Sequence, residues 1–259
     1  MDLALEGRTV LITGGSRGIG LATAMAFARE GCHVRLVARL PESLLSAQTQ
    51  VLAAGAPSCE VRSLDMGEPD AAASIAASFS QVDVLVNNAG EIPGGSLLDI
   101  SEERWRRSWD VKVFGYMNLT RAFYPQLVRA RGVVVNIIGI AGEMLDADYI
   151  AGSVGNAALI AFTKAFGSAS VKDGVRVVGI NPGPVLTDRS INLLKARTVR
   201  RGGDEAQWHE LEARYPMSRM ATPQEIASAV AFLSSPLSAY TSGSILNIDA
   251  GLSSRNYIA

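Results

Sequence analysis

The sequence predicts a doubly wound α/β fold, in which helices cover both faces of a parallel sheet of about seven strands. Short, nearly continuous Val/Ile/Leu runs alternate along the chain with longer segments whose apolar residues recur at helical spacing. Such runs are typical of parallel strands buried on both faces, and their alternation with helices is typical of a doubly wound sheet. The chain has 259 residues, 48% of them hydrophobic, which is enough for one large core.

The strand-like and helix-like segments follow one another in a regular order. The first run, RTVLITGG (8–15), ends in glycines, and apolar residues then recur at helical spacing through 19–31. Further strands are expected at 33–39, 59–65, 82–90, 132–139, 174–183 and 244–251, and helices at about 69–80, 101–130, 150–172 and 223–234. Since the sequence contains neither an internal repeat nor a low-complexity linker, we expect a single Rossmann-type domain over residues 1–259.

Residues 188–215 break this rhythm, because they are charged and contain a Gly–Gly pair at 202–203. One interpretation is a solvated helical excursion, and the other is a lid over a substrate cleft. Ligands in doubly wound sheets bind outside the carboxyl ends of the strands, and this segment follows such an end, which favours the lid. Leu193, Leu194 and Trp208 would then give the lid some apolar contact with a substrate.

Composition excludes several function classes. The formal net charge of −1 argues against nucleic-acid binding, and apolar runs shorter than about 18 residues argue against a membrane span. The start of the sequence lacks the pattern of a signal peptide, and Cys32 and Cys59 fit a reducing compartment, so we expect a cytoplasmic protein. Two histidines and two cysteines with no close spacing predict no metal site.

The segment TGGSRGIG (13–20) joins the first expected strand to the first expected helix. Gly14, Gly18 and Gly20 allow a tight turn and a close approach to a pyrophosphate. The start of the helix offers that anion unpaired N–H groups and the positive end of the helix dipole. The spacing differs from the common G-x-G-x-x-G fingerprint, but the position between strand and helix predicts a dinucleotide site.

Together with motifs further along, this loop resembles the short-chain dehydrogenase/reductase family over essentially the whole chain. The other matching motifs are LDM (64–66), NNAG (87–90), NPGPVLTD (181–188) and the tail from YPMSRM (215–220). The resemblance implies an NAD(P) cofactor and a homo-oligomer, either a dimer or a tetramer. It implies that Asp65 contacts the adenine, that the NNAG turn flanks the adenosine ribose, and that PGPV with Thr187 flanks the nicotinamide. The cofactor-binding residues expected in these motifs and in the glycine loop are Gly14, Ser16, Gly18, Ile19, Gly20, Asp65, Met66, Asn88, Ala89, Gly90, Pro182, Gly183, Val185 and Thr187.

The charges near the expected adenosine ribose favour NADP(H) over NAD(H). An NAD site usually has a carboxylate at the end of the second strand, whereas here that strand ends in Ala38 and Arg39. Arg17 lies within the glycine loop. Two guanidinium groups without a carboxylate suit a 2′-phosphate, although both could simply be solvated. We therefore expect NADP(H), with NAD(H) as the alternative.

The catalytic groups that the resemblance implies are missing. They are a tyrosine that transfers the proton, a lysine four residues later, a serine on the preceding strand and a helix asparagine. When the sequence is aligned on NAALIAFTKA (156–165), Asn156 stands at the lysine position and Gly152 at the tyrosine position. Gly139 stands at the serine position and Lys112 at the asparagine position. The usual assignment therefore does not carry over.

Tyr149 is the candidate proton donor. It lies seven residues before Asn156, a spacing that resembles a divergent branch of the family that includes enoyl-acyl-carrier-protein reductases. Tyrosine is an acid at neutral pH, so it serves reduction better than oxidation. The alternative is an ordinary loop aromatic at a helix start. Asn156 can still hydrogen-bond a ribose hydroxyl.

Lys112 is the candidate replacement for the lost cation, because Lys and Asn have exchanged places between positions 112 and 156. The alternative is that Lys112 points to solvent or pairs with Asp110 or Glu143. The sequence thus predicts an NADP(H)-dependent oxidoreductase that reduces a carbonyl or an activated C=C bond of a small molecule. The second hypothesis is a catalytically impaired NADP(H)-binding protein with a regulatory or scaffolding role.

Overall fold

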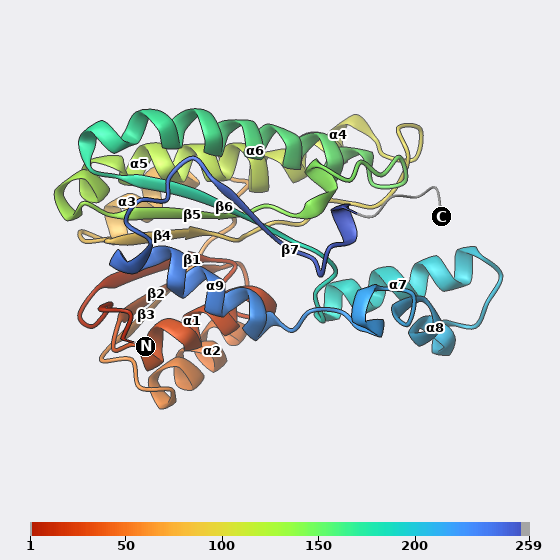
Figure 1. The fold of residues 1–259 in the computed structure, drawn as a ribbon, viewed down its shortest axis with the longest axis horizontal. Helices are drawn as coiled ribbons and strands as arrows, with labels where there is room; N and C mark the ends of the chain where they lie inside the picture. The colour runs from red at the N-terminus through yellow and green to blue at the C-terminus, as the bar shows by residue number, and fades with distance from the viewer. Residues whose placement is uncertain (1, 255–259) are drawn as a thin grey trace.

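A computed structural model describes residues 2–254, and its centre is one seven-stranded parallel sheet (Figure 1). The sheet confirms the predicted fold class. Across it the order is β3-β2-β1-β4-β5-β6-β7, so the order reverses between β1 and β4. Ligands in such sheets bind at this switch point. The strands are β1 (Thr9–Thr13), β2 (His33–Ala38), β3 (Cys59–Ser63), β4 (Val84–Asn87), β5 (Val133–Ile137), β6 (Arg176–Pro182) and β7 (Ile245–Ile248).

Helices cover both faces of the sheet (Figure 1). One face carries α1 (Gly18–Arg29), α2 (Pro41–Ala53) and α9 (Pro223–Ser234). The other carries α3 (Ala71–Ser78), α5 (Gly115–Ala130) and α6 (Ile150–Ser170), with α4 (Glu102–Trp109) leading into α5. None of the helices within residues 2–254 combines the length and the apolar character that crossing a membrane requires.

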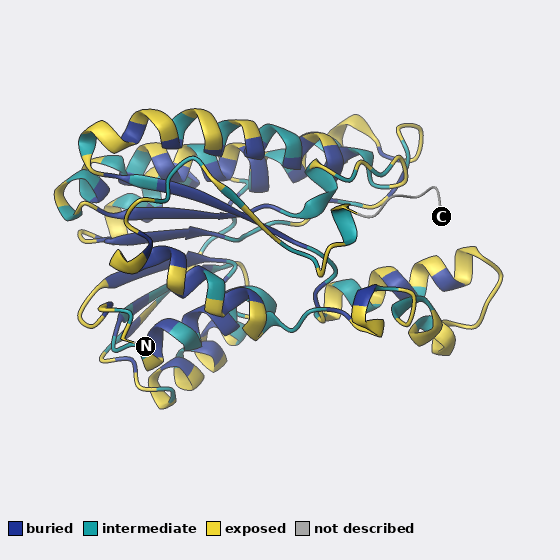
Figure 2. Cartoon of the chain, in the orientation of Figure 1, coloured by how far each residue is buried: buried dark blue, intermediate teal, exposed yellow. Residues whose placement is uncertain are grey.

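Two apolar cores lie between these layers, one on each face of the sheet. Figure 2 shows that the strands are the most buried part of the chain. Phe27 of α1 and Ile226 of α9 are fully buried against one face. Leu119 and Phe123 of α5 are fully buried against the other. The strands therefore read as continuous apolar runs because both of their faces are covered.

The structure differs from the sequence prediction in three respects. The helix expected over 101–130 is interrupted by a π-helical turn at Asp110–Phe114. The helix α2 was missed, although Leu44, Ala47 and Val51 are buried on one of its faces. All seven strands end one to three residues before the predicted end, and the motif residues that follow them lie outside the sheet.

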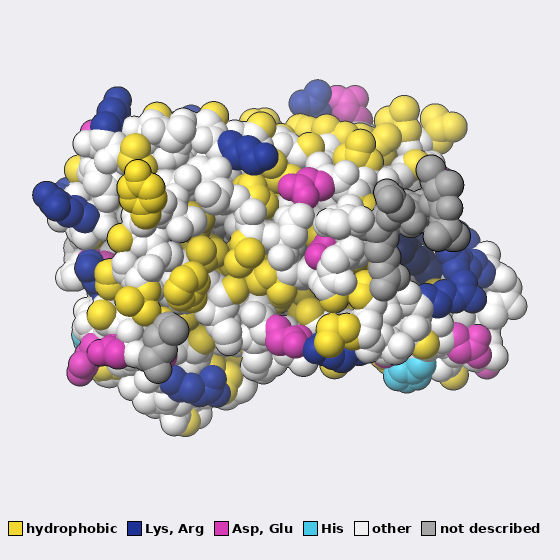
Figure 3. Space-filling view, in the orientation of Figure 1, with side chains coloured by type: hydrophobic (Ala, Val, Ile, Leu, Met, Phe, Trp, Pro, Cys, Tyr) yellow, Lys and Arg dark blue, Asp and Glu magenta, His cyan; other side chains and the backbone are white. Residues whose placement is uncertain are grey.

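A lobe formed by α7 (Asp188–Arg200) and α8 (Trp208–Glu212) projects beyond the carboxyl ends of the strands (Figure 1). It corresponds to the charged segment 188–215, and Figure 3 shows Lys and Arg side chains gathered beside α7. The lobe leaves the sheet after β6 and returns to it at α9. Its location places it beside the edge of the sheet where ligands of this fold class bind.

Candidate active site

The glycine loop lies at the end of β1 and fits an extended anion. Gly14 and Gly18 adopt φ values of +64° and +54°, which favour glycine. A Cβ at Gly20 would lie 2.2 Å from the Gly14 oxygen, so only glycine fits there. Arg17, the N-cap of α1, gives no side-chain cap hydrogen bond, and the first turn of this helix contains no acidic residue. The first N–H groups of α1 therefore suit a pyrophosphate.

The NNAG turn after β4 lies directly beside this loop. The Asn88 amide donates to the carbonyls of Thr13 and Gly14 at 2.9 and 3.2 Å. The Thr13 hydroxyl accepts from the Ala89 amide at 3.1 Å. One buried side-chain pair below, Asn87 to Asn136 at 2.9 Å, joins β4 to β5. These bonds fix the relative positions of the two predicted cofactor-binding turns.

The end of β6 also reaches the glycine loop. A Cβ added at Gly18 would lie 3.2 Å from Cγ2 of Thr187, which caps α7 by accepting from the Ser190 amide at 3.3 Å. The side chain of Val185 is buried in the core, and so is that of Met66 after β3. These two predicted contacts can therefore be made by the backbone alone. The other predicted residues in these turns are Ser16, Ile19, Gly90, Pro182 and Gly183.

Two predicted residues at the adenosine end are held in ion pairs. Arg39, just after β2, pairs with Glu91, and its Nη2 lies 2.5 Å from the Glu91 carboxylate. Asp65, after β3, pairs with Arg107 of α4. The expectation that no carboxylate lies near Arg39 is therefore wrong, because Glu91 reaches it from the loop that follows β4.

Lys112 is buried and makes contact with the residue at the family's lysine position. Its Nζ donates to the Ile138 carbonyl at 2.6 Å and to Oδ1 of Asn156 at 2.8 Å. Lys112 lies in the π-helical turn, a distortion that is frequent at functional sites. Burial, and to a lesser extent the nearby charge of Arg189, lower the pKa of Lys112 to about 7.

The alternative interpretation of Lys112 is wrong. Its side chain neither points to solvent nor pairs with Asp110 or Glu143. The Glu143 carboxylate instead accepts from Asn247 at 2.7 Å. Lys112 lies in the π-helical turn, and its side chain reaches Asn156 of α6, as the hypothesis of a relocated cation expects.

Asn156 and Gly139 complete this buried cluster. The Asn156 amide group donates to the Gly139 carbonyl at 3.3 Å, so both ends of its side chain are engaged within the protein. Gly139 adopts a φ of +126°, a conformation that strongly favours glycine. Position 139 therefore contributes a carbonyl oxygen and no side-chain hydroxyl. The predicted bond from Asn156 to a ribose hydroxyl stays a prediction.

The ring of Tyr149 fills the space above Gly152. A Cβ added at Gly152 would lie 1.9 Å from Cε1 and 2.2 Å from Cζ of Tyr149. The absence of a side chain at 152 is therefore what admits this ring. Tyr149 is the N-cap residue of α6, and it packs against the buried Ile92 and Ile100. A phenol thus lies against the position from which the family's tyrosine would extend.

Arg189 is a site residue that the sequence analysis missed. Its guanidinium donates to the carbonyls of Gly90 and Ile92 at 2.9 and 2.8 Å and lies 3.4 Å from the Tyr149 hydroxyl. A cation in the first turn of a helix is disfavoured by the helix dipole, so its placement in α7 needs another cause. The available signal was its position two residues after Thr187, at the end of β6.

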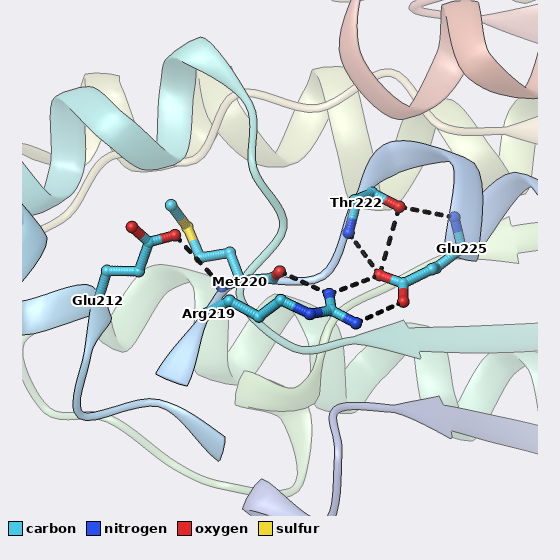
Figure 4. A network of polar contacts seen from close by, with 5 residues as sticks. All are labelled: Glu212, Arg219, Met220, Thr222 and Glu225. Carbon is cyan, nitrogen blue, oxygen red and sulfur yellow. Dashed lines mark hydrogen bonds and ion pairs between the residues drawn. The ribbon is translucent and has the colours of Figure 1, made fainter. Parts of the chain in front are cut away.

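The lobe of α7 and α8 is connected to the body of the protein at two places. Arg197 pairs with Asp146 at 2.8 Å, which connects α7 to the loop before Tyr149. At the return end, Arg219 pairs with Glu225 at 2.7 Å, and Glu212 accepts from the Met220 amide at 3.3 Å (Figure 4). Hydrogen bonds, chiefly from Arg219, lower the pKa of Glu225 to about 2.

The predicted apolar contact of the lobe with a substrate stays a prediction. Leu194 is buried, and Leu193 lies beside Gly94 of the loop after β4. Trp208 packs on the ring of His209, with ring centroids 3.6 Å apart. Ser153, another hydroxyl near the helix start, is bound to the backbone of Asp146. Within residues 2–254, no three His, Cys, Asp or Glu side chains are grouped to hold a metal ion.

Comparison by sequence finds oxidoreductases. The family model described as enoyl-(acyl carrier protein) reductase matches residues 14–253. The chain is 35% identical over 253 residues to 2-keto-3-deoxy-L-fuconate dehydrogenase of Xanthomonas campestris pv. campestris. This match covers 96% of the chain and 81% of that protein.

Comparison by structure finds the same class of protein. L-sorbose reductase from Gluconobacter frateurii, solved with NADPH and L-sorbose, matches with a TM-score of 0.92 at 30% identity, over 99% of this chain and 100% of the other. A putative NAD(P)-dependent gluconate 5-dehydrogenase from Beutenbergia cavernae, with bound NADP, matches with a TM-score of 0.88 at 30% identity, over 98% and 100%. Both of these matched structures contain an NADP-type cofactor.

Proposed function

The chain belongs to the short-chain dehydrogenase/reductase family, and on that premise we propose that it is an NADP(H)-dependent oxidoreductase with a rearranged active site. Its substrate would be a small molecule with a carbonyl group or an activated C=C bond. The observation that carries the proposal is the direct contact of Lys112 with Asn156. Lys112 is buried beside the position of the missing lysine, and in this proposal it supplies the positive charge that the family's lysine would carry.

The cofactor proposal is supported by the shape of the loops. The glycine loop, the NNAG turn and Thr187 would hold the dinucleotide, with the first N–H groups of α1 at its pyrophosphate. Arg39 would bind the 2′-phosphate once its bond to Glu91 opens. The bound nicotinamide would supply the hydride, and the remaining chemistry would belong to the side chains of this chain.

We assign the proton transfer to Tyr149. Its hydroxyl would donate a proton to the substrate atom that becomes negative as hydride arrives. Arg189, 3.4 Å away, can donate a hydrogen bond to the phenolic oxygen and so stabilise the negative charge left on it. The positive charge of Lys112 would act in the same direction from beneath the site.

The lobe of α7 and α8 would serve as the lid, with Arg189 as its catalytic contact. Because Arg189 bonds both the NNAG loop and Tyr149, movement of α7 would change the environment of the proton donor. Arg197 and Asp146 would hold the lid in this position. Exclusion of water by such a closure strengthens electrostatic interactions inside the site.

The test is NADPH consumption against a panel of ketones, quinones and enoyl thioesters. We expect turnover with one of these classes and a loss of roughly a hundredfold in kcat for Tyr149→Phe, the usual size of a general-acid contribution. Tyr240→Phe is the matched control, because Tyr240 is fully exposed. NADPH binding without turnover on any substrate would favour the catalytically impaired alternative, and no binding of either nucleotide would contradict both.

A further inference from the structure

A salt bridge crosses the end of β1 at the adenosine side of the site. Arg39 follows β2, Glu91 follows the turn after β4, and β2 and β4 are the two neighbours of β1 in the sheet. The glycine loop begins where β1 ends. The Arg39–Glu91 pair therefore connects the two strands on either side of the predicted nucleotide loop.

This pair is accessible and contributes little to folding. The side chains of Arg39 and Glu91 are 53% and 65% exposed, so a ligand can reach both of them. Exposed ion pairs typically contribute only about 0.2–1 kcal/mol to stability, and they separate readily when a stronger partner arrives. Glu91 should therefore affect the affinity for a charged ligand more than the stability of the fold.

We propose that Glu91 is a specificity-determining residue that weakens the preference of this protein for NADPH over NADH. The inference rests on the proposed function, because it assumes that a nicotinamide nucleotide binds at this loop. A 2′-phosphate must draw Arg39 away from Glu91, and the freed carboxylate then repels the phosphate. NADH carries no such phosphate, so it leaves the Arg39–Glu91 pair intact.

The size of the effect follows from the exposure of the pair. Solvent screening keeps both contributions, the broken bond and the repulsion, small. We expect them together to produce roughly a threefold to tenfold difference in NADPH affinity. Because neither contribution involves the nicotinamide, the effect should be present in binding without any turnover.

The experiment is calorimetric titration of the full chain with NADPH and with NADH. For Glu91→Gln we expect NADPH affinity to rise roughly threefold to tenfold and NADH affinity to change less than twofold. Glu60→Gln is the control, because it removes the same charge from a pair with Arg35 near the other end of β3. Equal changes for both nucleotides, or no change for either, would overturn the inference.

Repeating the titration in a variant that lacks Arg39 distinguishes competition for Arg39 from a general effect of the Glu91 charge. In the Arg39→Gln protein there is no ion pair to break and only the repulsion by Glu91 remains, so the further change Glu91→Gln should raise NADPH affinity by a smaller factor than in the wild-type background. An undiminished gain there would contradict the competition mechanism. If neither nucleotide binds to any variant, both the proposed function and the role of Glu91 are contradicted. If NADPH binds but the ratio to NADH never changes, only the role of Glu91 fails.

Discussion

The Nζ of Lys112 donates a 2.8 Å hydrogen bond to Oδ1 of Asn156, so the two residues that exchange places relative to the family pattern are in direct contact. The cation now comes from the π-helical turn before α5, while α6 supplies a neutral acceptor. The Ile138 carbonyl gives Lys112 a second acceptor, which satisfies two of its donors. The exchange therefore preserves a polar pair between the two helices with reversed identities.

The stability of this protein should rise with pH because of Lys112. Burial lowers its pKa from 10.5 to about 7, so between these values the unfolded chain binds the proton that the folded chain has released. Stability from this group therefore increases from about pH 7 upward, by at most about 5 kcal/mol. Below pH 7 both states are protonated and the full cost of burying the charge is present.

Urea unfolding of wild type and Lys112→Met at pH 7, 8 and 9 measures this effect. We expect the stability difference, wild type minus variant, to grow with pH, because other titrating groups affect both proteins alike. The variant also leaves the Ile138 carbonyl unpaired, but that cost does not depend on pH. A difference that is constant over the range would contradict the burial of a titrating Lys112.

The rate of reduction should fall as Lys112 loses its proton, at about pH 7. Removing the nearby charge with Arg189→Gln should shift this fall to higher pH, because Arg189 is one of the causes that lower the pKa of Lys112. The variant should also lose roughly tenfold or more in kcat through its contact with Tyr149. Rate profiles with NADPH, measured from pH 6 to 9, report both quantities, and Lys112→Met should lack the titration altogether.

If Arg189 only holds the lid in place, Arg189→Gln would lower the rate equally at every pH. Arg189→Lys is the matched variant, because it keeps the charge but lacks the guanidinium group that donates to the carbonyls of Gly90 and Ile92 at the same time. It should leave the pH of the fall nearly unchanged and still reduce kcat. If the pH at which the rate falls is the same in Arg189→Gln as in wild type, the charge of Arg189 does not influence the pKa of Lys112.

The sheet was predictable from sequence because its strands are buried on both faces and so form uninterrupted apolar runs. The glycine loop was predictable because turn geometry and close backbone approach require Gly14, Gly18 and Gly20. In both cases a local physical requirement leaves a local signal in the chain.

The rearranged centre was predictable only in outline. The exchange at positions 112 and 156 suggested a relocated cation, but the π-helical turn that directs Lys112 inward leaves no clear sequence signal. Arg189 and Glu91 were missed because each acts on a residue from a distant segment, Tyr149 and Arg39. Such pairings depend on the tertiary arrangement, which residue spacing does not specify.

Gly152 should be required for the position of Tyr149. A methyl group at 152 would overlap the phenol ring, so Gly152→Ala should displace Tyr149 and lower kcat about as much as Tyr149→Phe. The helix itself should persist, because alanine favours helical backbone over glycine by about 1 kcal/mol. Kinetics with circular dichroism measure both effects. Combining the two substitutions should cost no more than Tyr149→Phe alone, and additive losses would indicate that Gly152 acts on something else.

The ion pair between Arg197 and Asp146 should hold the lid against the body. Both side chains are partly exposed, so Arg197→Gln should cost little global stability but free α7 to open more often. We expect amide hydrogen exchange in 188–200 to become roughly twofold to fivefold faster, with the strands unaffected. Lys195→Gln is the control, because Lys195 pairs with Glu205 inside the lobe and not with the body. If hydrogen exchange accelerates equally in both variants, the substitutions destabilise the lobe itself, and the pair with Asp146 does not hold it against the body.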